Sequence, residues 1–184
     1  YLGNVDSFVD LTAGFGVDFS IIVRQFKYSM CIEKQKELCE IVSHNLSILN
    51  IKNATAINGD GLAYLQKMKP VDWIFIDPAR RDEHGGKLVS INDCEPDITQ
   101  WINLFKEKSK HTLIKLSPML DISLAIKELK DDGIVAFVTS SYFLDSKDSS
   151  LREQLSNEAS FVGAIRLPNN TFKNKAGTEV TTDI

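Results

Sequence analysis

Residues 8–18, FVDLTAGFGVD, carry the clearest indication of the fold of this chain. A short apolar run ends in Asp10, a Gly-x-Gly turn follows, and a helical pattern begins at Asp18. Gly14 and Gly16 allow the backbone to turn tightly and to come close to a ligand. The N–H groups at the start of the following helix favour a carboxylate in the same crevice. Taken by itself, the stretch fits either a ligand-binding loop or a generic strand-to-helix turn.

Beyond this stretch, short apolar runs alternate with helical patterns along the whole chain. Strands are expected at residues 8–11, 29–32, 54–57, 73–76, 112–114, 134–138 and 161–165. Helices are expected at residues 18–25, 34–49, 62–67, 98–105, 122–129 and 148–158, with a loop over residues 78–96. Because strand and helix alternate, the connections are crossovers and the sheet is mostly parallel. The predicted fold is α/β, doubly wound and Rossmann-like, with a sheet of seven strands.

The composition excludes several classes of protein. The 184 residues, 43% of them hydrophobic, suit one α/β domain, and no apolar run approaches the roughly 20 residues that span a bilayer. A net charge of −4 does not fit a strongly basic nucleic-acid binder, so such contacts must come from local patches or a further domain. Cys31, Cys39 and Cys94 form neither a disulfide framework nor a zinc spacing. This pattern predicts no metal and a reducing cytoplasm.

Acidic residues follow the second and third expected strands. Ligands of such sheets bind beyond the carboxyl ends of the strands, where Glu33 and Asp60 are expected. Glu33 also fits the acid of a dinucleotide-binding fold, but the full G-x-G-x-x-G pattern is absent because position 19 is Phe19. Two simpler interpretations stay open. Glu33 can be a solvated acid at a helix start, and Asp60 can be a helix N-cap.

The fourth expected strand ends in FIDPARRD, residues 75–82. The Asp77 carboxylate and the Pro78 carbonyl can accept hydrogen bonds from an amino group and aim its nitrogen at a reaction partner. Arg80 can stack on a base or bind a phosphate. The alternatives are a strand end with a stop signal for Asp77-Pro78 and, for Arg80-Arg81, a solvated pair bridged to neighbouring acids.

Together these segments resemble the class I S-adenosylmethionine-dependent methyltransferases. The resemblance implies that the glycine loop holds the methionine part of S-adenosylmethionine, Glu33 the ribose and Asp60 the adenine. Amino-directed nucleic-acid methyltransferases carry Asp/Asn-Pro-Pro-aromatic after the fourth strand, and here Ala79 and Arg80 replace its last two residues. The implied catalytic residues are Asp77, Pro78 and Arg80. The implied cofactor-binding residues are Asp10, Thr12, Ala13, Gly14, Gly16, Asp18, Glu33, Lys34, Asp60 and Gly61.

Two finer resemblances divide the chain. VDLTAGFGVD (residues 9–18), IDPARR (76–81) and KLSPMLDI (115–122) make residues 1–129 similar to the bacterial THUMP-like methyltransferases. DGIVAFVTS (132–140), GAIRLPNNTF (163–172) and KAGTEVTTDI (175–184) resemble the end of the N6-adenine DNA methylase domain of helicase-methylase proteins. A seam is therefore expected near residues 129–132. The segment KLSP lacks the cysteine that uracil-C5 RNA methyltransferases need, which argues against covalent C5 chemistry.

These resemblances imply a bacterial, cytoplasmic methyltransferase that acts on a base amino nitrogen of RNA or DNA. The alternative function is a non-catalytic module that binds S-adenosylmethionine or a nucleotide for a larger assembly. We expect one catalytic domain over residues 1–184, cut from a longer protein that also carries an N-terminal substrate-binding module. The final strand is expected to be incomplete, and residues 171–184 are expected to form a poorly ordered tail. No membrane partner is expected.

Overall fold

The computed structural model describes residues 6–80, 94–116, 134, 136, 139–140, 142–168 and 182–183. The chain divides into two compact units, Tyr1–Leu116 and Ser117–Ile184, and each is described by itself. The expectation of a single catalytic domain stays a prediction. Within the described part of the chain, no helix is long and apolar enough to cross a membrane.

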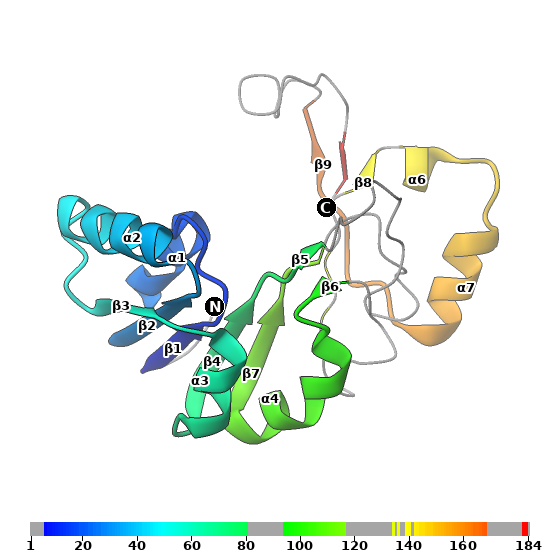
Figure 1. Ribbon diagram of the computed structural model, residues 1–184. Helices are drawn as coiled ribbons and strands as arrows, with labels where there is room; N and C mark the ends of the chain where they lie inside the picture. The colour runs from blue at the N-terminus through cyan, green and yellow to red at the C-terminus, as the bar shows by residue number, and fades with distance from the viewer. Residues whose placement is uncertain are drawn as a thin grey trace. The chain divides into compact units, whose positions relative to one another are not determined.

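The first unit is built on a parallel five-stranded sheet (Figure 1). Its strands run in the order β3-β2-β1-β4-β7, and every neighbouring pair is parallel. They are β1 (Ser7–Asp10), β2 (Tyr28–Glu33), β3 (Ala54–Asn58), β4 (Val71–Ile76) and β7 (Ser109–Ile114). The strand order reverses between β1 and β4, which is where ligands bind in doubly wound sheets. The α/β class is confirmed, whereas the count of seven strands stays a prediction.

Helices cover both faces of this sheet, with α1 and α2 on one face and α3 and α4 on the other (Figure 1). They are α1 (Val17–Ile22) with the 3-10 turn η1 (Val23–Gln25), α2 (Lys36–Ile48), α3 (Gly61–Lys67) and α4 (Ile102–Lys108), which follows the 3-10 turn η3 (Ile98–Trp101). Each coincides with an expected helix to within a few residues. Right-handed crossovers explain the two faces, because the chain moves from β1 toward β3 and then returns to β4 and β7.

One hydrophobic core cluster of the first unit lies between the sheet and the helices α1 and α2. The Phe8 ring packs against Phe26 and Phe19, with ring centroids 4.9 and 6.0 Å apart. Val42 and Leu46 of α2 close the same cluster. Burying each such side chain contributes about 1.5–3 kcal/mol, so these contacts hold α1 and the loop before it firmly against the sheet.

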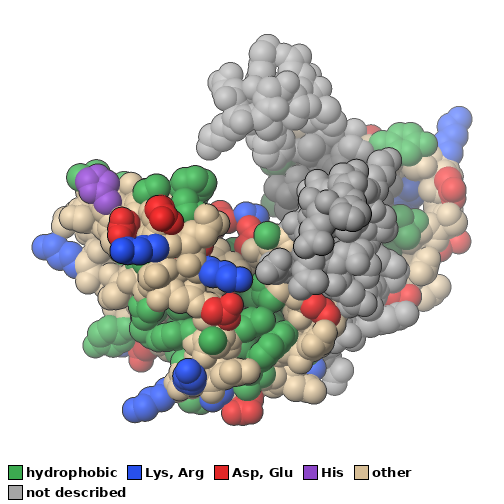
Figure 2. Space-filling model, in the orientation of Figure 1, with side chains coloured by type: hydrophobic (Ala, Val, Ile, Leu, Met, Phe, Trp, Pro, Cys, Tyr) green, Lys and Arg blue, Asp and Glu red, His purple; other side chains and the backbone are tan. Residues whose placement is uncertain are grey.

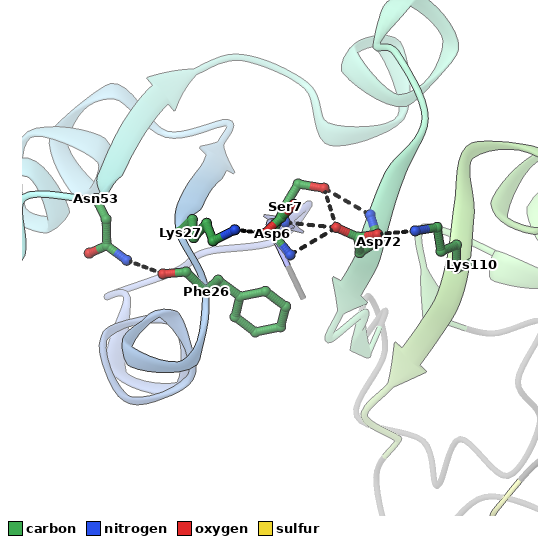
Figure 3. A network of polar contacts seen from close by, with 7 residues as sticks. All are labelled: Asp6, Ser7, Phe26, Lys27, Asn53, Asp72 and Lys110. Atoms are coloured by element: carbon green, nitrogen blue, oxygen red, sulfur yellow. Dashed lines mark hydrogen bonds and ion pairs between the residues drawn. The ribbon is translucent and has the colours of Figure 1, made fainter. Parts of the chain in front are cut away.

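A polar network ties three strands together at the amino edge of the sheet (Figure 3). The Asp72 Oδ2 atom accepts hydrogen bonds from the backbone N–H groups of Asp6 and Ser7 and from the Ser7 hydroxyl, each at 3.0 Å. The Lys110 ammonium donates to Asp72 Oδ1 at 2.5 Å. This hydrogen bond, together with the backbone donors, holds the pKa of Asp72 well below its usual range. The network lies at the sheet edge opposite to the strands' carboxyl ends.

In the second unit, the described residues form a small antiparallel sheet and two helices. The sheet has the order β8-β10-β9, with β8 (Thr139–Ser140), β9 (Arg166–Leu167) and β10 (Thr182–Asp183). The helices are α6 (Tyr142–Asp145) and α7 (Ser150–Glu158), and α7 confirms the helix expected at 148–158. The predicted helix at 122–129, the seam at 129–132 and most of the predicted strand at 134–138 lie outside the described residues. So does the predicted tail, apart from Thr182 and Asp183 in β10.

The strand expected at residues 161–165 is wrong. These residues have no regular secondary structure, and strand β9 begins only at Arg166. The apolar side chains of Phe161, Val162 and Ile165 are 77%, 90% and 66% exposed. A continuous apolar run forms a buried strand only if neighbouring strands pair with it on both sides. The sequence alone does not reveal whether such neighbours are present.

Candidate functional site

A cleft of about 860 Å³ opens at the carboxyl edge of the parallel sheet. This volume falls within the range of about 300–1,000 Å³ that small-molecule sites occupy. The cleft lies over the ends of β1, β2, β3 and β4, as the switch-point rule predicts. It brings together most of the predicted site residues, namely Asp10, Thr12, Ala13, Gly14, Asp18, Glu33, Lys34, Asp60, Gly61, Asp77 and Pro78.

Asp10 ends β1 and is buried, with 1% of its surface exposed. Its Oδ1 atom accepts a hydrogen bond from the Thr12 backbone N–H at 2.8 Å. Burial raises the pKa of Asp10 to about 7; the Thr12 N–H opposes the rise, and the nearby charges of Asp18, Asp77 and Glu33 add to it. A buried acid with a strongly raised pKa in a cleft is a frequent mark of a functional site.

Gly16 belongs to the same loop but does not line the cleft itself. It is the N-cap of α1 with a φ of 73°, a left-handed conformation that strongly favours glycine. A Cβ atom added there would lie 2.9 Å from Val42 Cγ1 of α2. The packing against α2 and the left-handed conformation therefore both call for glycine at this position, and the predicted contact of Gly16 with the cofactor stays a prediction.

Glu33 ends β2 and binds the glycine loop directly. Its Oε2 atom accepts a hydrogen bond from the Gly14 backbone N–H, and its Oε1 atom accepts one from the Gln35 N–H, both at 2.8 Å. The side chain is 8% exposed, so the alternative of a solvated acid at a helix start is wrong. Each carboxylate oxygen retains a further lone pair that can accept a hydroxyl donor in the cleft.

Asp60 and Gly61 bring the start of α3 onto the same loop. Asp60 is the N-cap of α3, and its Oδ1 atom accepts the Ala63 N–H at 2.9 Å, which confirms the helix-cap interpretation. A Cβ atom added to Gly61 would lie 2.1 Å from the Leu11 carbonyl oxygen. Only glycine permits this approach, so the end of β3 and the loop after β1 form one continuous wall of the cleft.

Asp77 directly follows β4, and two contacts hold it in position. Its backbone N–H donates to Thr12 Oγ1 at 2.7 Å, and its Oδ2 atom lies 3.0 Å from Lys115 Nζ. The same Lys115 nitrogen lies 2.6 Å from Asp18 Oδ2. Hydrogen bonds to Asp18 and then to Asp77 raise the pKa of Lys115. The sequence analysis gave Lys115 no role, although its position directly after the fifth expected strand was a usable signal.

The predicted loop over residues 78–96 is pinned at its two ends by a short antiparallel ribbon. Strand β5 (Ala79–Arg80) pairs with β6 (Cys94–Glu95), and Ala79 lies opposite Glu95. This pairing places Pro96 near Pro78 and leads the chain into η3, whose Trp101 lines the cleft. Trp101 is a second residue that the sequence analysis missed. The side chain of Arg80 lies outside the described residues, so its predicted role stays a prediction.

Comparisons with known proteins give one matching family model and several similar solved structures. A family model described as conserved hypothetical protein 95 matches residues 2–115. No curated protein matches the sequence. Among solved structures, a putative methyltransferase from Porphyromonas gingivalis W83 is similar, with 31% identity and a TM-score of 0.59. The match covers 68% of this chain but only 31% of that protein, so the chain spans about a third of its length.

Two more distant structures are also similar. An rRNA methylase from Streptococcus thermophilus has 15% identity and a TM-score of 0.50, with 74% of this chain and 79% of that chain covered. A putative methyltransferase from Streptococcus mutans in complex with SAH has 12% identity and a TM-score of 0.45, over 99% of this chain and 90% of that chain. Likeness to the rRNA methylase is evidence for the shared Rossmann-like methyltransferase fold alone.

Proposed function

The chain belongs to the conserved hypothetical protein 95 family, and from this premise we propose that it is an S-adenosylmethionine-dependent methyltransferase that acts on a base amino nitrogen of RNA or DNA. One observation carries the proposal. A single cleft joins the glycine loop, Glu33 and Asp60 to Asp77-Pro78 on the neighbouring strand end. The glycine loop, Glu33 and Asp60 fit a methyl donor, and Asp77-Pro78 fits the acceptor of the methyl group.

The chemistry of the cleft fits S-adenosylmethionine, which carries a sulfonium, an ammonium and ribose hydroxyls. The pKa of Asp10 at about 7 reflects burial and the repulsion of neighbouring carboxylates, which a cationic ligand relieves. Asp10 and the loop from Thr12 to Gly14 would hold the methionine end. The remaining lone pairs of Glu33 would accept the ribose hydroxyls, and Asp60 would accept the adenine amino group.

The acceptor side of the site would orient the substrate. Bound S-adenosylmethionine supplies an electrophilic methyl group. The Asp77 carboxylate and the Pro78 carbonyl accept hydrogen bonds from the substrate amino group and hold its nitrogen toward that methyl group. The bond of the Asp77 N–H to Thr12 Oγ1 ties this acceptor site to the donor loop. A fixed geometry between donor and acceptor can supply much of the barrier reduction.

Recruitment of nucleic acid would rely on more than the visible face of the first unit. On the face shown in Figure 2, the described Lys and Arg side chains are scattered among acidic ones instead of forming one basic field. The chain also spans only about a third of the similar Porphyromonas protein. We infer that a substrate-binding module elsewhere in the full-length protein brings RNA or DNA to the cleft. The protein is cytoplasmic in this proposal.

Binding measurements on the full-length protein test the donor side. Calorimetric titration with S-adenosylmethionine and S-adenosylhomocysteine should give saturable one-site binding. Glu33→Gln should weaken binding at least about tenfold, since it removes a charge-assisted acceptor and disturbs the Gly14 N–H bond. Glu37→Gln, on the exposed side of α2, is the matched control and should bind as wild type does. If neither sulfur ligand binds, the proposal is wrong.

Transfer of a tritiated methyl group from S-adenosylmethionine tests the acceptor side. Ribosomal RNA and genomic DNA from a strain that lacks the gene serve as unmethylated substrates, because native nucleic acid would already be modified. We expect incorporation into one of them and loss of incorporation in Asp77→Ala. Binding of S-adenosylmethionine without transfer to either nucleic acid would support the alternative of a non-catalytic binding module.

A further inference from the structure

Lys115 occupies a position that the sheet itself determines. It directly follows β7, and its backbone N–H donates to the Ile76 carbonyl at 2.9 Å, one step beyond the paired residues Ile76 and Ile114. The backbone of Lys115 therefore lies beside Asp77 in the same register as the parallel sheet. The motif KLSP thus begins at the carboxyl edge, next to the strand end that carries Asp77.

The Lys115 side chain bridges two carboxylates from different elements. Its Nζ atom lies 2.6 Å from Asp18 Oδ2 in the first turn of α1 and 3.0 Å from Asp77 Oδ2 after β4. All three side chains are about half exposed, with exposed fractions of 54%, 44% and 39%. Ion pairs at such exposure contribute little to stability, so folding alone gives little reason for this arrangement.

We propose that Lys115 is a positioning residue for methyl transfer, which holds the Asp77 carboxylate by Oδ2 and leaves Oδ1 to accept the substrate amino group. This inference rests on the proposed function and adds a residue to its acceptor site. Asp18, which the resemblance assigned to the cofactor, becomes the anchor of Lys115. Without the ammonium, Asp18 and Asp77 would repel each other, and the Asp77 side chain would rotate away from its bridging position.

The same ammonium also balances charge in the cleft. Asp10, Asp18, Glu33 and Asp77 are close enough to interact, and the last three raise the pKa of Asp10. Removing the positive charge of Lys115 leaves Asp18 and Asp77 uncompensated, which should raise the pKa of Asp10 further. This effect depends on the charge of Lys115 and not on the bulk of its side chain.

A pair of variants in the full-length protein separates charge from bulk. Lys115→Met keeps the length of the side chain and removes the charge, whereas Lys115→Arg keeps the charge and both hydrogen bonds. We expect Lys115→Met to lower kcat at least about tenfold while KM for S-adenosylmethionine changes less than about twofold, because the loss falls on orientation of the acceptor. Lys115→Arg should retain most of the wild-type kcat.

Carbon-13 NMR titration of the Asp10 carboxyl gives a readout that does not need activity. In Lys115→Met the Asp10 pKa should rise by roughly half a unit or more, and in Lys115→Arg it should stay at the wild-type value. An unchanged Asp10 titration in Lys115→Met, or a kcat equal to that of an active wild type, overturns the role of Lys115 alone. A wild-type protein that binds no S-adenosylmethionine overturns the proposed function instead.

Discussion

Replacing Asp10 by asparagine tests the electrostatics of the cleft through the stability of the protein. The Asp10 carboxyl is buried, and its pKa in the folded chain is about 7 against an ordinary value of 3.8. The folded state therefore keeps a proton on Asp10 to a higher pH than the unfolded state does. Asn has nearly the same shape, and its amide oxygen can still accept the Thr12 N–H. Asp10→Asn therefore removes the titration with little change in packing.

The size of the effect follows from the two pKa values. The difference between a pKa of 3.8 and one of about 7 corresponds to about 4 kcal/mol between the protonation states. Since the folded pKa is raised, the wild-type free energy of unfolding is highest at low pH and falls between about pH 4 and pH 7. Between pH 5 and pH 8 this group alone should lower it by about 3 kcal/mol. Asp10→Asn should lack that decrease and be the more stable protein at pH 8.

Urea denaturation of the wild type and Asp10→Asn at pH 5 and pH 8 measures this difference directly. Glu37→Gln, which changes an exposed acid on α2, should leave the difference between the two pH values as in the wild type. Equal stability changes with pH in the wild type and Asp10→Asn would refute the reasoning. That result would mean that Asp10 titrates near its ordinary pKa, and that the cleft has no need of a cation.

Three further substitutions test the fold and the cleft. Asp72→Ala should lower the free energy of unfolding by about 2 kcal/mol at pH 7, because its hydrogen-bond donors lose their acceptor. The difference from wild type should shrink in strong acid, since the pKa of Asp72 is depressed and its contribution is lost as pH falls through it. Gly61→Ala should cost about 2 kcal/mol in urea denaturation and weaken binding of S-adenosylmethionine, because the new Cβ would lie 2.1 Å from the Leu11 carbonyl oxygen. Gly59→Ala, where a Cβ atom meets nothing within 4 Å, is its matched control. Trp101→Ala should raise KM for the nucleic acid about tenfold in the methyl-transfer assay if its ring stacks on the base, and Trp101→Phe should stay close to wild type.

The part of the fold that the sequence predicted well is the part with the strongest local signals. The apolar run at the end of β1, the Gly-x-Gly turn and the helix after it are consecutive, so no distant partner is needed to interpret them. The run from Trp73 to Ile76 likewise predicts a central strand, because it is apolar on both faces. The run at residues 161–165 is also apolar but forms no strand, because its pairing partners are not encoded locally.

The same distinction between local signals and distant contacts applies to the candidate site. Asp10, Glu33 and Asp60 could be placed at one edge because each follows its own strand, and parallel strands end together. The sequence could not predict that Glu33 binds the Gly14 N–H or that Gly61 touches Leu11, since both contacts depend on the packing of one loop against another. The sequence did not predict the contact of Lys115 with Asp77, which depends on the pairing of β4 with β7, or the place of Trp101 at the cleft, which follows from the pairing of β5 with β6.

The carboxylates of the cleft differ in how many hydrogen bonds and ion pairs the protein itself offers them. This difference affects which ligand the proposed methyl-transfer site favours. Both oxygens of Glu33 accept backbone N–H groups, and Asp77 has the ammonium of Lys115. Asp10 accepts a single backbone N–H among its described contacts and carries the strongly raised pKa. A cation therefore gains the most binding free energy beside Asp10, whereas a neutral ligand gains less. In the proposed reaction, methyl transfer would turn a cationic sulfonium into a neutral thioether, so the carboxylates that favour binding of the donor would attract the product more weakly. The electrostatic strain that lowers the stability of the unliganded fold would thereby favour release of the product.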